Sequence, residues 1–109
     1  MSEGSRGRLD PDPIRFSQAS VRCRFGDDGT IDDLAEGLRV GRVRPEDVPP
    51  VRLVEREELL FTLDNRRLEA FRRAGVDVPY RMAFPKEIFR EAWKSTTKND
   101  GASIRIRGE

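Results

Sequence analysis

The chain contains no histidine, a single cysteine and no long hydrophobic run. Because no imidazole is available, the residues exclude Ser-His-Asp and Cys-His hydrolysis, nucleases with histidine metal ligands, and acid–base mechanisms that use two histidines. Cys23 stands alone, which excludes an internal disulfide and a cysteine zinc site, and its alternating context "VRCRF" predicts a buried strand position. No apolar run approaches the roughly 20 residues of a transmembrane helix, so we expect no membrane partner.

The composition is rich in charge and poor in apolar residues. Charged residues make up 38% and apolar residues 36%, which predicts one domain with a small core and disordered ends. The net charge of +1 does not by itself indicate a nucleic-acid-binding protein. Arginine nevertheless dominates the basic residues, and its planar fork of donors suits carboxylates and phosphates.

The beginning of the chain differs in composition from the rest. Residues 1–13, "MSEGSRGRLDPDP", are mostly Gly, Ser, Pro and charged residues, which predicts a flexible leader or the remnant of a linker. Order is expected to begin at "IRFSQ", so residues 14–109 are predicted to form a single domain.

Apolar periodicity and turn residues predict the elements of this domain. Strands are expected at residues 14–16, 51–55, 59–63, 78–84 and 103–108, and the second and third form a tight hairpin with its turn at 56–58. Helices are expected after Thr30, after the Asp-Asn pair at 64–65, and from Pro85, with Gly41 and Gly75 ending the first two. Strands and helices mixed within one small domain indicate the α+β class.

One stretch, "FTLDNRRLEAFRRAG" at residues 61–75, places charged residues where a strand passes into a helix. Asp64 and Asn65 can each cap the helix, but Arg66 and Arg67 fall in its first turn. There the macrodipole disfavours each cation by about 0.3–1 kcal/mol. A bound anion would offset this cost, since helix N-termini attract phosphate groups. Two interpretations follow: a phosphate site, or a helix cap with solvated charges.

Other polar residues are candidates for the same site. Ser17 and Gln18 directly follow the first expected strand, and they either face a ligand or form an ordinary polar turn. The loop "TTKND" at 96–100 offers hydroxyl, ammonium and carboxylate groups for a phosphate or a divalent ion, or is simply solvated. Arg105 shares one strand face with Arg107. It either adds a cation, if that strand lies beside the phosphate site, or belongs to an exposed sheet face.

The run "LDNRRLEAFRRAGVDVP" resembles the signature of the ParB/sulfiredoxin-like superfamily, in which Gly-Glu-Arg-Arg precedes a helix, an Ala-Gly pair and a Pro-led strand. Upstream, "IRFSQ" resembles the first strand and Gln-containing turn of that family, and "VPPVRLVEREELLFTL" resembles the hairpin that leads into the signature. The resemblance spans roughly Ile14 to Tyr80. It implies a small domain of that fold, a mixed sheet with about three helices.

The resemblance also implies that the loop and the helix start bind nucleotide phosphates. ParB proteins bind CTP, sulfiredoxins use ATP, and other relatives act as free-serine kinases, ATPases or DNases. Carried over by position, Arg66 and Arg67 contact phosphate. Asn65 stands at the place of the sulfiredoxin nucleophilic cysteine; because an amide forms no thiol adduct, we expect it to orient the substrate instead. Asp64 is expected to act as general base or metal ligand, since the chain has no histidine for either role.

The "DNRRL" variant together with "SIRIRG" is similar to the ParB-like C-terminal domains of bacterial polymorphic, Rhs-type toxins. This implies an effector that acts on nucleic acid or nucleotide by hydrolysis or phosphoryl transfer, with Mg²⁺, another divalent cation or a nucleoside triphosphate as candidate cofactor. Such a toxin would be secreted, act in the cytoplasm of a target cell and have a cognate immunity protein; otherwise we expect a cytoplasmic protein. The alternative is a non-catalytic, nucleotide-dependent binding module.

Overall fold

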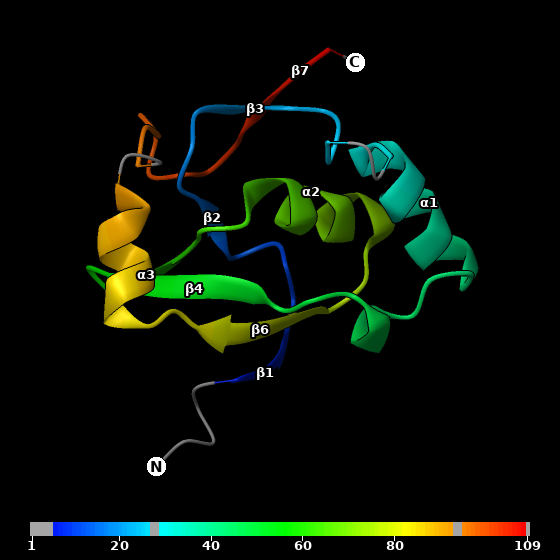
Figure 1. Ribbon diagram of the computed structural model, residues 1–109, viewed down its shortest axis with the longest axis horizontal. Helices are drawn as coiled ribbons and strands as arrows, with labels where there is room; N and C mark the ends of the chain where they lie inside the picture. Colours follow the sequence, from blue (N-terminus) through cyan, green and yellow to red (C-terminus); the bar gives the residue numbers. More distant parts are fainter. Residues whose placement is uncertain (1–5, 27–28, 93–94, 109) are drawn as a thin grey trace.

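The computed structural model describes residues 6–26, 29–92 and 95–108 (Figure 1). Its strands are β1 (Arg6–Leu9), β2 (Arg15–Phe16), β3 (Ser20–Arg22), β4 (Val51–Arg56), β5 (Leu59–Thr62), β6 (Val78–Met82) and β7 (Arg105–Arg107). Its helices are α1 (Ile31–Val40), α2 (Asn65–Ala74), α3 (Pro85–Arg90) and a short 3-10 turn, η2 (Pro45–Asp47). Within these residues, three α-helices and a mixed five-stranded sheet confirm the α+β class.

Two sheets lie on either side of a helical layer. The large sheet has the strand order β1-β6-β4-β5-β2, and the small sheet pairs β3 with β7. In the large sheet, β2 runs parallel to β5, with Phe16 beside Thr62. Because parallel strands end at the same edge, the residues that follow β2 lie beside those that lead from β5 into α2. This pairing brings Ser17 and Gln18 next to the start of α2.

The core forms where α1 and α2 meet the two sheets. Side chains from α1, α2 and the large sheet make the main cluster, which includes Phe16, Leu38, Val51, Leu53, Leu68, Phe71 and Val78. A second cluster joins the other side of the helices to the small sheet: it contains Val21, Ile31, Ala35 and Ala70, with Ile106 packed against them. The helical layer therefore separates the two sheets (Figure 1), and the start of α2 is close to both.

The helix boundaries follow the local signals in the sequence. Thr30 Oγ1 accepts a hydrogen bond from the Asp33 N–H at 3.1 Å, and Asp33 Oδ2 accepts one from the Thr30 N–H at 3.0 Å, which forms the expected capping box of α1. Gly41 and Gly75 adopt the left-handed conformation at the ends of α1 and α2, with φ of 83° and 69°. Both helices end where the glycines predict.

The hairpin between β4 and β5 is closed by a two-residue turn. Arg56 pairs with Leu59, which leaves Glu57 and Glu58 as the turn residues, with φ of 52° and 69°. Positive φ at both positions is typical of a type I′ turn, which favours Asn-Gly and disfavours residues with long side chains. We expect the double substitution Glu57→Asn and Glu58→Gly to stabilise the domain by about 1 kcal/mol, measured by urea denaturation.

A charge control for the hairpin is Glu55→Gln, since Glu55 is exposed on β4 and its loss removes one negative charge outside the turn, where the turn variant removes two. This variant is expected to change the free energy of unfolding by less than about 0.5 kcal/mol. Equal stabilisation by the control and the turn variant would assign the gain to charge and contradict the backbone explanation.

The structure differs from the sequence expectation in several segments. Residues 6–9, expected within a flexible leader, form β1 and pair antiparallel with β6. Composition does not predict this strand, because its hydrogen-bond ladder with β6 and the packing of Leu9 on the core depend on residues far away in the sequence. Apolar residues at helical spacing, Ile88, Phe89, Ala92 and Trp93, predict the helix from Pro85. The observed helix, α3, ends at Arg90 and leaves Phe89 86% exposed; Trp93 lies outside the described residues. Cys23 follows β3 and is half-buried, with its thiol donating to the Gly108 carbonyl at 3.3 Å.

No helix in the described ranges combines the length and the apolar character that a membrane crossing requires.

Candidate functional site

A small pocket of about 90 Å³ lies at the start of α2. It is lined by residues from the β2 turn, the loop after β3 and the first turn of α2, namely Gln18, Phe25, Leu63, Asp64, Asn65, Arg66 and Arg67. The N-cap residue, Asp64, makes no capping hydrogen bond with its side chain, so the first-turn N–H groups keep no partner from the cap. The pocket therefore combines helix N–H donors, partial positive charge and two arginines in a space that holds a few water molecules or one phosphate-sized group.

Asn65 links the turn after β2, which contains Ser17 and Gln18, to the start of α2 by hydrogen bonds. Its side chain is buried, and Oδ1 accepts hydrogen bonds from the N–H groups of Ser17 at 2.8 Å and Gln18 at 3.3 Å. Its Nδ2 group donates to Ser17 Oγ at 3.0 Å and to Gln18 Oε1 at 3.2 Å. The amide is thus engaged with the protein at both ends. Asn65 positions Gln18 at the pocket wall, whereas Ser17 is buried beneath it.

The loop at 96–101 supports the β2 turn from its other side. The N–H groups of Thr96 and Thr97 donate to the Ser17 carbonyl at 2.8 and 3.1 Å, and Thr96 Oγ1 accepts from the Ala19 N–H at 3.0 Å. Gly101 closes this loop on β2: its φ is 71°, and a Cβ atom there would lie 2.1 Å from the Phe16 carbonyl oxygen. The loop that the sequence offers as a further phosphate binder therefore holds the β2 turn in place.

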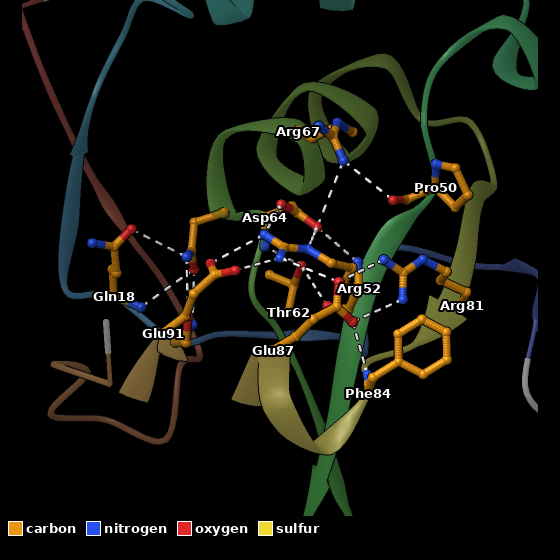
Figure 2. A network of polar contacts seen from close by, with 12 residues as sticks. Gln18, Pro50, Arg52, Thr62, Asp64, Arg67, Arg81, Phe84, Glu87 and Glu91 are labelled. Carbon is orange, nitrogen blue, oxygen red and sulfur yellow. Dashed lines mark hydrogen bonds and ion pairs between the residues drawn. The ribbon is translucent and has the colours of Figure 1, made fainter. Parts of the chain in front are cut away.

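Asp64 forms a close pair with Arg52 of β4 (Figure 2). Arg52 Nε and Nη2 donate to the two carboxylate oxygens at 3.0 and 2.8 Å, and the Arg52 backbone N–H donates to Oδ2 at 2.8 Å. Burial alone would raise the pKa of Asp64, but the hydrogen bonds from Arg52 and the nearby Arg67 lower it below its usual value. An ionised carboxylate with a depressed pKa and both oxygens bonded is a poor general base. Its geometry matches a positioning role.

Arg52 continues the charge network toward α3. Arg52 Nη1 donates to Glu91, which lies just after α3, and Nη2 donates to Glu91 at 3.1 Å as well as to Asp64. Glu87 lies 3.7 Å from Arg52 Nη1. Glu87 also forms a two-point pair with Arg81 at 2.9 and 2.7 Å, and these hydrogen bonds are the main cause that lowers its pKa to about 2. Figure 2 shows these side chains converging from β4, β6 and α3 below the start of α2. The network neutralises Asp64 and holds this residue in place at the pocket wall.

The two first-turn arginines are held in different ways. Arg67 Nη1 donates to the Pro50 carbonyl at 3.2 Å and lies 3.6 Å from Asp64 Oδ2 (Figure 2). Burial lowers the pKa of Arg67 and Asp64 opposes that shift, but a guanidinium stays charged at any physiological pH. Arg66 Nη1 donates to the Arg24 carbonyl at 2.6 Å, and its guanidinium lies 5.7 Å from the centre of the Phe25 ring. Both residues line the pocket, and a backbone carbonyl holds the guanidinium of each.

Arg105 does not line this pocket. It projects from β7 and borders a different hollow with Lys98 and Asn99. Three other arginines lie nearer to Arg66, and the sequence did not mark them as site residues. Arg22, Arg24 and Arg107 line a groove of about 640 Å³ together with Arg66. Arginines alternate with other residues in both "VRCRF" and "SIRIRG", which indicates an arginine face on each strand. The sequence does not show that these two strands pair.

A divalent cation does not fit the carboxylate that the sequence favours as its ligand. Among the described residues, no three side chains of the Cys, Asp and Glu types come together as a metal site. Both oxygens of Asp64 accept hydrogen bonds from Arg52, so a cation would have to displace a charge-assisted pair.

Comparisons of the chain with protein-family models, with curated proteins and with solved structures find no match. The ParB/sulfiredoxin-like resemblance stays a hypothesis that rests on the residues of the chain.

Proposed function

We propose that this domain binds phosphate groups of nucleic acid or nucleotide at the start of α2, as the effector part of a ParB-like toxin. The observation that carries the proposal is the pocket in which helix N–H donors, Arg66 and Arg67 converge while Arg52 neutralises the adjacent carboxylate. Two cations in the first turn oppose the macrodipole, and a bound phosphate offsets that cost. As such an effector, the domain would act in the cytoplasm of a target cell and have a cognate immunity protein.

In this proposal the arginines neutralise the phosphate and the helix N–H groups orient it. Gln18 borders the phosphate, while Asn65 and Asp64 hold the surrounding backbone in place. Phosphoryl transfer depends mostly on positioning and charge stabilisation, which such a pocket supplies for hydrolysis of a phosphodiester or a nucleotide.

A second candidate is a binding module that holds nucleotide without turnover. It is favoured by the bonding of Asp64 to Arg52, which engages the carboxylate nearest the pocket. The two candidates share the phosphate site and differ in the chemistry that follows binding.

The experiment measures binding and turnover in one panel. Purified protein is titrated with four nucleoside triphosphates and with single-stranded DNA and RNA, with Mg²⁺ or with a chelator, and products are followed over time. Arg66→Gln and Arg67→Gln are each expected to weaken binding by about tenfold or more, since each removes one charge-assisted contact. Products that form with the wild type and disappear with Arg66→Gln support the effector; binding without products supports the module.

Arg39→Gln is the matched control for this panel. Arg39 is exposed on α1 and pairs only locally with Glu36, so its loss changes the net charge by the same amount away from the pocket. It is expected to bind each ligand as the wild type does. Absence of binding to every ligand, or equal losses in Arg39→Gln and Arg66→Gln, would overturn the phosphate-site proposal.

A further inference from the structure

An exposed arginine face covers the outer side of the small sheet. β3 and β7 are parallel, and Arg22 pairs with Arg107 while Val21 pairs with Ile106. Val21 and Ile106 pack toward the helices in the second core cluster. Because neighbouring residues of a strand point to opposite faces, Arg22 and Arg107 project together from the other side, and both are exposed.

These cations have no acidic partner among the described residues. The structure gives ion pairs to Arg52, Arg73 and Arg81, but within the described ranges it gives none to Arg22, Arg24, Arg105 and Arg107. Like charges directly opposite each other on neighbouring strands destabilise a sheet. A chain whose net charge is only +1 thus places three exposed arginines on the small sheet, Arg22, Arg105 and Arg107, with Arg24 exposed just after β3. Their mutual repulsion would be relieved by a polyanion.

The arginine face is continuous with the pocket at the start of α2. The groove lined by Arg22, Arg24 and Arg107 also includes Arg66, which lines the pocket as well. The hydrogen bond from Arg66 to the Arg24 carbonyl ties the two together. At about 640 Å³, the groove is several times larger than the pocket, so it has room for more than one phosphate group.

We propose that this groove is a track for the backbone of a single-stranded nucleic acid whose phosphate enters the pocket at α2. The inference rests on the proposed function and deepens it by naming a polymeric, single-stranded ligand. Arg22 pairs directly with Arg107 across the two strands and Arg24 follows two residues later, so three cations besides Arg66 line the groove. A cationic groove of this kind is typical of proteins that bind single strands.

The surroundings of the groove disfavour an anionic membrane as its ligand. Membrane-surface proteins combine basic residues with an adjacent apolar face. Here the exposed large hydrophobic residues lie elsewhere: Val40 ends α1, and Phe84, Ile88 and Phe89 belong to the start and body of α3. In Figure 1, α3 and the β3–β7 sheet occupy different regions of the molecule.

The test compares ligands of different length. Fluorescence anisotropy and competition are used to measure binding of a mononucleotide and of single strands of about 2 and about 12 nucleotides. The triple variant Arg22→Gln, Arg24→Gln and Arg107→Gln is expected to bind the longer strand about 30-fold more weakly and the mononucleotide unchanged. The slope of log affinity against log salt should fall by about 2, since each phosphate contact on a single strand contributes about 0.7.

The matched control replaces three exposed arginines outside the groove, namely Arg39, Arg42 and Arg90, with glutamine. The groove variant should fold, because it removes like-charge repulsion from the surface, and an unchanged or raised Tm checks this. The track is overturned if both triple variants weaken the long strand equally, if duplex binds as tightly as single strand, or if anionic vesicles compete. Each of these outcomes would overturn the track without contradicting mononucleotide binding at the pocket. Failure of Arg66→Gln to affect the mononucleotide would instead overturn the phosphate pocket.

Discussion

Replacing Asn65 with alanine is expected to destabilise the domain by about 3 kcal/mol, since the truncation leaves the buried Ser17 N–H and the Gln18 N–H without their acceptor. Each buried group that loses its partner costs about 1–3 kcal/mol. The same change frees the β2 turn from the start of α2, so the pocket loses the wall formed by Gln18. Urea denaturation measures the first effect, and nucleotide titration of the folded fraction measures the second.

Two further variants separate the contributions of this amide. Gln18→Ala removes only the hydrogen bond from Asn65 Nδ2 to Gln18 Oε1 and is expected to cost less than about 1 kcal/mol. Asn65→Asp keeps the acceptor for both N–H groups but replaces the donor with a carboxylate, which repels phosphate from the pocket. We expect Asn65→Asp to be more stable than Asn65→Ala and equally weak in phosphate binding. A fully stable Asn65→Ala protein would show that the amide does not hold the turn.

Replacing Arg52 with methionine is expected to cost about 3 kcal/mol at neutral pH, because the partly buried charges of Asp64 and Glu91 lose the cation that they share. Arg67 is then the nearest cation to Asp64, at 3.6 Å, and its attraction to the unpaired carboxylate draws it away from the phosphate. Phosphate affinity is therefore expected to fall as well. Chemical denaturation and nucleotide titration measure the two effects, and Arg52→Lys, which keeps the charge but loses the planar fork, should lie between wild type and Arg52→Met.

The effect of Arg52→Met depends on pH in a defined direction. The pKa of Asp64 is lowered in the folded protein and that of Glu87 is about 2, so both stabilise the fold above their ordinary pKa values of about 4. This stability is lost as the pH falls from about 4.5 toward 2. Without Arg52, burial raises the pKa of Asp64, so the variant loses less on acidification. The stability difference between wild type and variant should shrink below about pH 4; a constant difference would contradict the ion-pair explanation.

Local signals in the sequence determined where most elements begin and end. Thr30, Asp33 and Gly41 bound α1, Gly75 ends α2, and the hairpin turns at Glu57 even though neither turn residue is Gly or Asn. Such signals work from sequence because capping, periodicity and turn formation involve residues only a few positions apart. The same locality made the first turn of α2 a candidate for the proposed phosphate site, since its two arginines are neighbours in the chain.

The tertiary structure alone decided what surrounds those arginines. Asn65 meets Ser17 across 48 positions, and Arg52 meets Asp64 across 12, so neither partner is implied by the local pattern. Through these contacts Asn65 and Asp64 hold parts of the site together, and the chemical roles expected of them stay predictions.

The arginine face likewise arises from pairing two stretches at opposite ends of the chain, with Arg22 beside Arg107. Alternation assigns each arginine to one face of its own strand, but which strands become neighbours depends on how the whole core packs. For this protein the sequence by itself determined most of the elements and the placement of two arginines in the first turn of α2. The assembly of the site around them was decided by long-range contacts, because their free energy depends on the complete fold rather than on any one segment.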